Sequence, residues 1–379
     1  TGPKSLTVRM QESDLVSFNR TSEHLTIKPE GVYSCGMAPK QSTFGPYGRY
    51  IYLTYLFYDG GGIFDSQKKH FVHTITPAYP RKSSKSAAAR GCQLTEQCFI
   101  PGKNRYLATQ MTTGTVFEYD LGKFGKSRES AVPLDKGHSS SFSENNTPLG
   151  SDSNSFSFIR TIPSGGAWPK YMAYCYQLDI LAVSNWKSNN VTIIKHSSGK
   201  VIHNIEPIQS PRGLAFSPKG KHLYITSFNG GTVHKYRTID WMETGQIHRD
   251  HAAMRHAVLS KDGKQLYVSD MANDRVYCID AKAFTIEDSY HVPVNPNTID
   301  LTPDGRFLFV SARGPNNPAS YLLKSPRPGK IHIIDTKLQK VIFSLNGGTQ
   351  PTGLDISPDG TRLVFTNFQD NTFEVYRIR

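Results

Sequence analysis

Cationic side chains recur at one position of a sequence repeat. Each of seven repeat copies has a Thr or Ser at an equivalent position. The residue fourteen positions before that Thr or Ser is Lys or Arg in four copies and an acid in none. These cations are Lys40, Lys170, Arg212 and Arg255. Like charges at one opening repel unless counter-ions, water or an anionic ligand offset the repulsion. The pattern predicts that the cations bind an anion at the mouth of a central channel. The alternative is that the cations are widely separated and individually solvated.

Two neighbouring residues would extend this site. Trp168 precedes Pro169 and Lys170, which predicts an indole beside a cation, as in sites that stack bases or sugars. His256 follows Arg255 and would add a titratable donor. The predicted ligand-binding residues are therefore Lys40, Trp168, Lys170, Arg212, Arg255 and His256.

Other chemistry has weaker support in the sequence. His248, Asp250, His251 and His256 lie in HRDHAAMRH, but no helical spacing makes them converge, so we predict no metal site. GxSxG, phosphate-loop and haem-attachment motifs are missing, so we predict no catalytic residues and no cofactor. The alternative is an enzyme of the lactonase or quinoprotein type, which would need carboxylates at the channel, with Asp300 and Asp355 as candidates.

The repeat that carries these residues is visible along most of the chain. Its second strand reads GRYIYLTY at 48–55, LDILAVSN at 178–185, GKQLYVSD at 263–270 and GTRLVFTN at 360–367. Three successive intervals between the equivalent Thr or Ser residues are 42, 43 and 42 positions, and the longer intervals contain insertions. These residues, called anchors below, are Thr54, Thr109, Ser184, Thr226, Ser269, Ser311 and Thr366.

Each repeat unit predicts a four-stranded antiparallel sheet. An apolar strand and a Pro/Asp/Gly turn precede the anchor strand, and a third and usually a fourth strand follow it. Such sheets must stack on their neighbours and close into a ring, which predicts an all-β, seven-bladed β-propeller. The last copy stops after its third strand, so an N-terminal segment within 1–38, HLTIKP at 24–29 in preference to SLTVRM at 5–10, should complete that blade.

The tetrapeptides AVSN, YITS, YVSD, FVSA and VFTN, which follow SPDG-type turns, resemble the YVTN-repeat β-propellers of bacteria. The stretch from NPNTIDLTPDG to LVFTNF is similar to a subgroup of exported and surface-antigen propellers. The resemblance implies a periplasmic or cell-surface binding or antigen protein. It does not select a ligand, because the repeat motif is architectural.

Charge and composition bear on partners. The chain has 379 residues and a formal net charge of +13, which favours anionic partners such as a polyanion, acidic glycan, nucleic acid strand or acidic protein surface. A purely structural antigen with no channel ligand is the alternative. There is no run of about eighteen apolar residues that would span a bilayer, and we expect one propeller domain and a monomer.

Several loops carry expectations of their own. The loop at 80–91 adds basic residues to the face of the predicted mouth, and the Pro-rich insertion at 313–329 is a stiff candidate lid or partner loop on the same face. The Ser-rich insertion at about 123–155 should emerge on the opposite face and be disordered. Cys35 and Cys92 lie in neighbouring entering loops, where a disulfide is geometrically possible.

Overall fold

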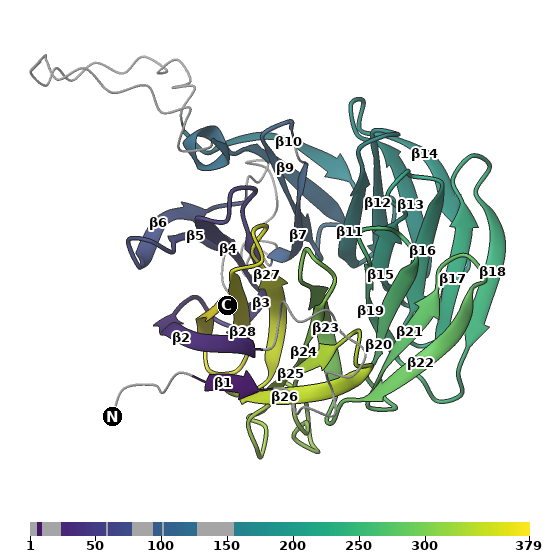
Figure 1. Ribbon diagram of the computed structural model, residues 1–379. Helices are drawn as coiled ribbons and strands as arrows, with labels where there is room; N and C mark the ends of the chain where they lie inside the picture. Colours follow the sequence, from purple (N-terminus) through teal and green to yellow (C-terminus); the bar gives the residue numbers. More distant parts are fainter. Residues whose placement is uncertain (1–5, 10–23, 58–59, 78–93, 101, 127–154) are drawn as a thin grey trace, which may run out of the picture.

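The computed structural model of the chain describes residues 6–9, 24–57, 60–77, 94–100, 102–126 and 155–379. Among these residues the strands form seven antiparallel sheets, which are arranged around a central axis (Figure 1). The predicted all-β, seven-bladed propeller is therefore confirmed. A short 3-10 helix, η2 (Gly122–Gly125), follows the third strand of blade two.

The first three blades contain four strands each. Blade one is β3 (Pro39–Phe44), β4 (Tyr50–Tyr55), β5 (Gly61–Asp65) and β6 (His70–Ile75). Blade two is β7 (Leu94–Ile100), β8 (Arg105–Gln110), β9 (Thr115–Asp120) and β10 (Ser157–Pro163). Blade three is β11 (Pro169–Cys175), β12 (Ile180–Asn185), β13 (Asn190–Lys195) and β14 (Lys200–Ile205).

The next three blades repeat the same order. Blade four is β15 (Pro211–Phe216), β16 (His222–Ser227), β17 (Thr232–Arg237) and β18 (Met242–His248). Blade five is β19 (Met254–Leu259), β20 (Gln265–Asp270), β21 (Arg275–Asp280) and β22 (Thr285–His291). Blade six is β23 (Pro296–Leu301), β24 (Phe307–Ala312), β25 (Lys330–Asp335) and β26 (Lys340–Asn346).

Blade seven closes the ring with strands from both ends of the chain. It contains β27 (Pro351–Ile356), β28 (Arg362–Asn367), β29 (Thr372–Ile378), β2 (His24–Ser34) and β1 (Leu6–Arg9). Strand β2 pairs with β29 from Ile27 opposite Ile378 to Ser34 opposite Thr372, which confirms the predicted closing segment. Strand β1, which was not expected in the sheet, pairs with the outer edge of β2.

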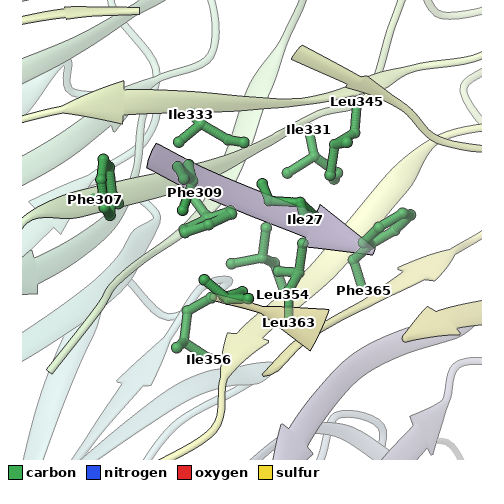
Figure 2. Packing of buried hydrophobic residues seen from close by; sticks show 12 residues of the cluster. Ile27, Phe307, Phe309, Ile331, Ile333, Leu345, Leu354, Ile356, Leu363 and Phe365 are labelled. Atoms are coloured by element: carbon green, nitrogen blue, oxygen red, sulfur yellow. The ribbon is translucent and has the colours of Figure 1, made fainter. Parts of the chain in front are cut away.

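The closing strand is fixed by apolar packing as well as by backbone hydrogen bonds. Leu25 and Ile27 of β2 lie in a buried cluster between blades six and seven, among side chains such as Ile331, Leu354 and Phe365 (Figure 2). Burying two such side chains favours closure by roughly 3–6 kcal/mol. Strand β2 therefore contributes to the core of the ring.

The anchor residues explain why the repeat has a Thr or Ser at this position. All seven are fully buried. The Ser184 hydroxyl accepts a hydrogen bond from the Tyr171 N–H of its own blade at 3.0 Å and donates to the Arg212 carbonyl of the next blade at 2.9 Å. Ser269 and Ser311 make the equivalent pairs of contacts. Each such hydroxyl thus links the first strands of two neighbouring blades, which line the axis and are called inner strands below. The link lies beside the residue fourteen positions before an anchor, which we call the rim position.

Candidate anion-binding site

The rim position is held by a repeated backbone geometry. Every inner strand has a register shift at its start, so the regular alternation of side chains is broken there. In five blades the strand begins with Pro, and the residue before that Pro has positive φ, for example 60° at Trp168. The Trp168 carbonyl accepts the Trp186 N–H at 3.0 Å, which fastens this turn to the next strand.

Arg212 and Arg255 meet at a buried carboxylate. Arg212 Nη2 lies 2.8 Å from Glu96 Oε1, and Arg255 Nη2 lies 3.9 Å from the same oxygen. The three residues come from blades four, five and two, so their side chains meet across the axis. Arg212 is 3% exposed and Arg255 5% exposed. The ring therefore brings together two of the predicted cations, as the repeat required.

Lys40 and Lys170 lie nearer the opening, where both are half-buried. Burial and the positive charges of Arg255 and Arg212 hold the pKa of Lys40 well below its ordinary value. Burial and the Arg212 charge lower the pKa of Lys170 to about 7. These shifts are electrostatic evidence that the four rim cations share one region, because the guanidinium groups act on both lysines.

A fifth cation, Arg313, was missed because it lies two residues after an anchor and not at the rim position. It is buried, its guanidinium lies 5.5 Å from the Tyr321 ring and 5.8 Å from the Phe368 ring, and it donates a hydrogen bond to the Gln350 side chain. Burial and the Arg212 charge lower the pKa of Arg313, with the Tyr321 hydroxyl opposing them, to about 10. We call Lys40, Lys170, Arg212, Arg255, Arg313 and Glu96 the axial cluster.

Glu96 corrects the expectation that the rim carries cations without a carboxylate. It stands one residue after the rim position, where the bulge in β7 removes it from the regular alternation. The residue after each rim position is the signal that could have revealed Glu96. Tyr171 and His256 occupy this position in blades three and five, and the centres of their rings lie 5.1 Å apart, so side chains at this position also meet. The cluster still has more cations than carboxylates.

Several buried polar atoms of this region have no hydrogen-bond partner among the described residues. They are Arg212 Nη1, Thr95 Oγ1, His256 Nδ1, Arg313 Nε and both amide atoms of Asn297. Leaving a buried donor unsatisfied costs about 1–3 kcal/mol. Donors that point into a region of positive charge are suited to an anionic acceptor.

The structure places the two remaining predicted residues in different ways. Trp168 is 41% exposed, with the Lys170 ammonium 5.7 Å and the Lys187 ammonium 5.5 Å from its ring, so the predicted pairing of indole and cation is present. His256 is buried beside the cluster. Burial and the Arg255 charge lower its pKa to about 3, so the expected titratable donor is a neutral imidazole at neutral pH.

Asp300 and Asp355 lie deeper along the inner strands and act on the backbone. Asp300 accepts the Ile356 N–H of blade seven at 2.8 Å, and Asp355 accepts the Phe44 N–H of blade one at 2.7 Å. Burial raises the pKa of Asp300 to about 6, and burial together with the Asp300 charge raises the pKa of Asp355 well above its ordinary value. Both carboxyls are therefore protonated more readily than an exposed aspartate.

The other candidate segments have varied outcomes. The insertion at 313–329 lies between β24 and β25 and is fastened to blade seven, where Gln369 Nε2 donates to the Tyr321 and Leu323 carbonyls at 2.8 and 2.6 Å. The loop at 80–91, Cys92 and nearly all of the Ser-rich insertion lie outside the described residues. Cys35 is a free thiol.

The His-rich segment does not form a cluster. His248 and Asp250 make an exposed contact of 3.3 Å, whereas His256 is buried on the inner strand β19. No group of three His, Cys, Asp or Glu residues that could hold a metal ion occurs in the described part of the chain. No helix among the described residues has the length and apolarity that a bilayer crossing requires.

Comparison with known proteins finds two partial similarities. Residues 198–379 match the family model "Lactonase, 7-bladed beta-propeller". The chain is also similar to Antigen Lp49 of Leptospira interrogans serogroup Icterohaemorrhagiae serovar copenhageni, with 36% identity over 234 residues. This alignment covers 60% of the chain and 51% of the relative, so the chain spans about half the length of that protein. The family description agrees with the seven-bladed fold, and the name of the relative states no ligand.

Proposed function

We propose that the protein is a non-catalytic binding propeller that holds an anionic group at the axial cluster. The main support is the meeting of Arg212 and Arg255 at the Glu96 carboxylate, together with unpartnered donors such as Arg212 Nη1. The charge of Arg212 also acts on the other three basic side chains of the axial cluster. A carboxylate or phosphate group would offset the repulsion between the cations and accept these hydrogen bonds. The group would belong to a small acid or to a polyanion, acidic glycan, nucleic acid or acidic protein.

The protein is proposed to work outside the cytoplasm, in the periplasm or at the cell surface of a bacterium. Similarity to a protein named an antigen supports this placement, together with the resemblance to exported YVTN-repeat propellers. Fractionation of cells that express the protein at its natural level tests it.

The word lactonase in the family description raises hydrolysis as a second candidate. The candidate bases that the sequence offers for hydrolysis are the carboxylates of Asp300 and Asp355. Asp300 and Asp355 are half-buried and already accept backbone N–H groups of the next blade, so we assign them a structural role in joining blades.

Lys170→Met tests the proposed anion site with little disturbance of the fold. The ammonium makes no ion pair with a carboxylate of the described residues and lies 2.9 Å from the Met111 sulfur, so its removal relieves repulsion from Arg212 and Arg255. We expect affinity for inorganic phosphate, measured by isothermal titration calorimetry at low salt, to fall about tenfold, since hydrogen bonds to charged groups contribute about 1.5–3 kcal/mol. Thermal stability should stay the same or rise.

The matched control is Lys187→Met. Lys187 lies over the same Trp168 ring but is exposed on the loop after β12. Its removal should leave phosphate affinity within about twofold, because exposed charges are screened by solvent and salt. Equal losses in the two variants would mean that the general surface charge, and not the axial cluster, attracts the anion.

A further inference from the structure

The residues two positions after each anchor form a second, largely apolar ring at the same opening. They are Leu56, Met111, Trp186, Phe228, Met271, Arg313 and Phe368, and we call them the collar. In every collar residue except Met111, the backbone N–H donates to a carbonyl of the turn that enters the inner strand, as Phe228 N does to the Ser210 carbonyl at 3.1 Å. The collar is therefore positioned by the same repeat geometry as the rim cations.

The collar is in direct contact with the axial cluster. Lys170 Nζ lies 2.9 Å from the Met111 sulfur, and Lys40 Nζ lies 5.7 Å from the centre of the Phe368 ring. The Trp186 and Phe228 rings are 5.0 Å apart, so they form a continuous aromatic surface across blades three and four. A group bound to the cations would have apolar side chains beside it.

Access to the collar differs around the ring. Leu56, Phe368 and Arg313 of blades one, seven and six are buried, and the loop at 313–329 packs against Phe368. Met111, Trp186, Phe228 and Met271, of blades two to five, are half-exposed. Lys170, Arg212 and Arg255 belong to blades three, four and five, so the accessible apolar arc and these cations occupy the same sector.

We propose that the ligand of the axial cluster is an amphipathic small molecule, in which an acidic group is attached directly to an aromatic ring. This inference rests on the proposed anion site. Arg212 and Arg255 are too deeply buried to contact a broad macromolecular surface, so the proposed ligand is a small acidic group such as a carboxylate or phosphate. The aromatic part then stacks on Trp186 and Phe228, where contacts with ring faces add affinity independent of the charge.

Three probes separate the contributions of charge and ring. Calorimetry compares inorganic phosphate, 1-naphthyl phosphate and uncharged 2-naphthol with the full chain. We expect 1-naphthyl phosphate to bind about tenfold more tightly than inorganic phosphate, as stacking on aromatic side chains contributes about 1–3 kcal/mol. 2-Naphthol should show no measurable binding. Equal affinity for the two phosphates would contradict the amphipathic ligand but not the anion site. If neither phosphate bound, both the amphipathic ligand and the anion site would be contradicted.

Phe228→Ser locates the ring of the probe. It should reduce the preference for 1-naphthyl phosphate to about twofold or less and leave phosphate affinity unchanged. The matched control is Phe57→Ser, which removes an exposed aromatic ring beside Phe368, in the covered sector. If the preference for 1-naphthyl phosphate over inorganic phosphate persists in Phe228→Ser, or is lost equally in Phe57→Ser, the aromatic ring does not bind at the half-exposed collar residues of blades two to five.

Fluorescence gives a measurement that leaves the collar intact. In a Trp168→Phe, Trp241→Phe protein, Trp186 is the remaining tryptophan of the three in the chain. Saturation with 1-naphthyl phosphate should quench its emission, and inorganic phosphate should not. Unchanged emission at saturation would place the ring away from Trp186 and overturn the proposal.

Discussion

The inner strands of blades six, seven, one and two differ from those of blades three, four and five. In the first group polar side chains bond to the backbone of a neighbouring blade. Asp300 and Asp355 do so, and Gln41 Oε1 accepts the Gln97 N–H at 2.5 Å. Blades three, four and five have Ala173, Ala215 and Val258 at the position of the two aspartates. Their rim positions hold Lys170, Arg212 and Arg255.

The difference shows how one repeat can support two tasks. In the group that begins at blade six, which we call the stitched half, carboxyl and amide groups are satisfied by neighbouring strands and add to ring closure. In the group of blades three to five, the cationic half, small apolar side chains suffice for packing at the aspartate position. The cations are then free of carboxylate partners except at Glu96, so this half is available for a ligand.

Glu96→Gln should have the largest effect on the stability and the phosphate affinity of the protein. Removing one partner of a buried charge pair commonly costs about 3–5 kcal/mol, and here the carboxylate faces several cations. We expect the free energy of unfolding to fall by about 3 kcal/mol in low salt. Affinity for phosphate should rise, because the variant has lost the competing anion, and added phosphate should restore much of the stability in denaturant titrations.

Glu118→Gln is the control for that experiment. Glu118 is also buried and paired, with Arg160 at 2.6 Å and His196 at 2.9 Å, but it lies on the third strand of blade two. Its loss should destabilise the protein without recovery in phosphate. If both variants recovered equally, phosphate would be acting on the folded state in general, and the cationic half would have no special role.

Asp355→Asn tests the stitched half through its pH dependence. The folded-state pKa values of Asp300 and Asp355 are raised, so their contribution to stability is fully present below the ordinary carboxyl value and is lost as pH rises through the raised values, of which that of Asp300 is about 6. Asn keeps an oxygen for the Phe44 N–H and can donate to Asp300. We expect the variant to be more stable than the wild type at pH 8, by on the order of 2 kcal/mol, with a flatter profile between pH 4 and 8.

Thermal unfolding at pH 4, 6 and 8 would measure this, and Asp304→Asn is a suitable control because Asp304 lies in an exposed turn after β23. A wild type whose stability does not decline between pH 4 and 8 relative to Asp355→Asn would show that the folded-state pKa values of the two carboxyls are not raised.

The sequence predicted the ring better than it predicted the site. Spacing of the anchors, the Pro at the start of inner strands and the incomplete last copy together predicted seven blades and the closing role of residues 24–29. These features are local and repeat along the chain. Glu96 and Arg313 were missed because their contribution depends on a β-bulge and on side chains that reach across the axis. His256 was misjudged, since burial beside Arg255 suppresses its protonation.

The anchor hydroxyls provide the smallest effect and the closest comparison of the two halves. Ser184→Ala removes the link between blades three and four, and Ser311→Ala removes the link between blades six and seven. Both serines are fully buried and bond to one N–H and to a carbonyl of the next blade. Each loss should cost about 1–2 kcal/mol in denaturant unfolding, and the two costs should agree within about 0.5 kcal/mol.

Ser198→Ala, in an exposed turn, is the control and should be neutral. The two halves differ in what their rim and aspartate positions hold, but the anchors do the same work in both. A much larger cost for Ser184→Ala would mean that its hydroxyl also restrains Arg212 against the repulsion of the cluster, because the Arg212 carbonyl is its acceptor. Added phosphate would then reduce the cost of Ser184→Ala and leave that of Ser311→Ala unchanged, which would tie ring closure to ligand binding in the cationic half alone.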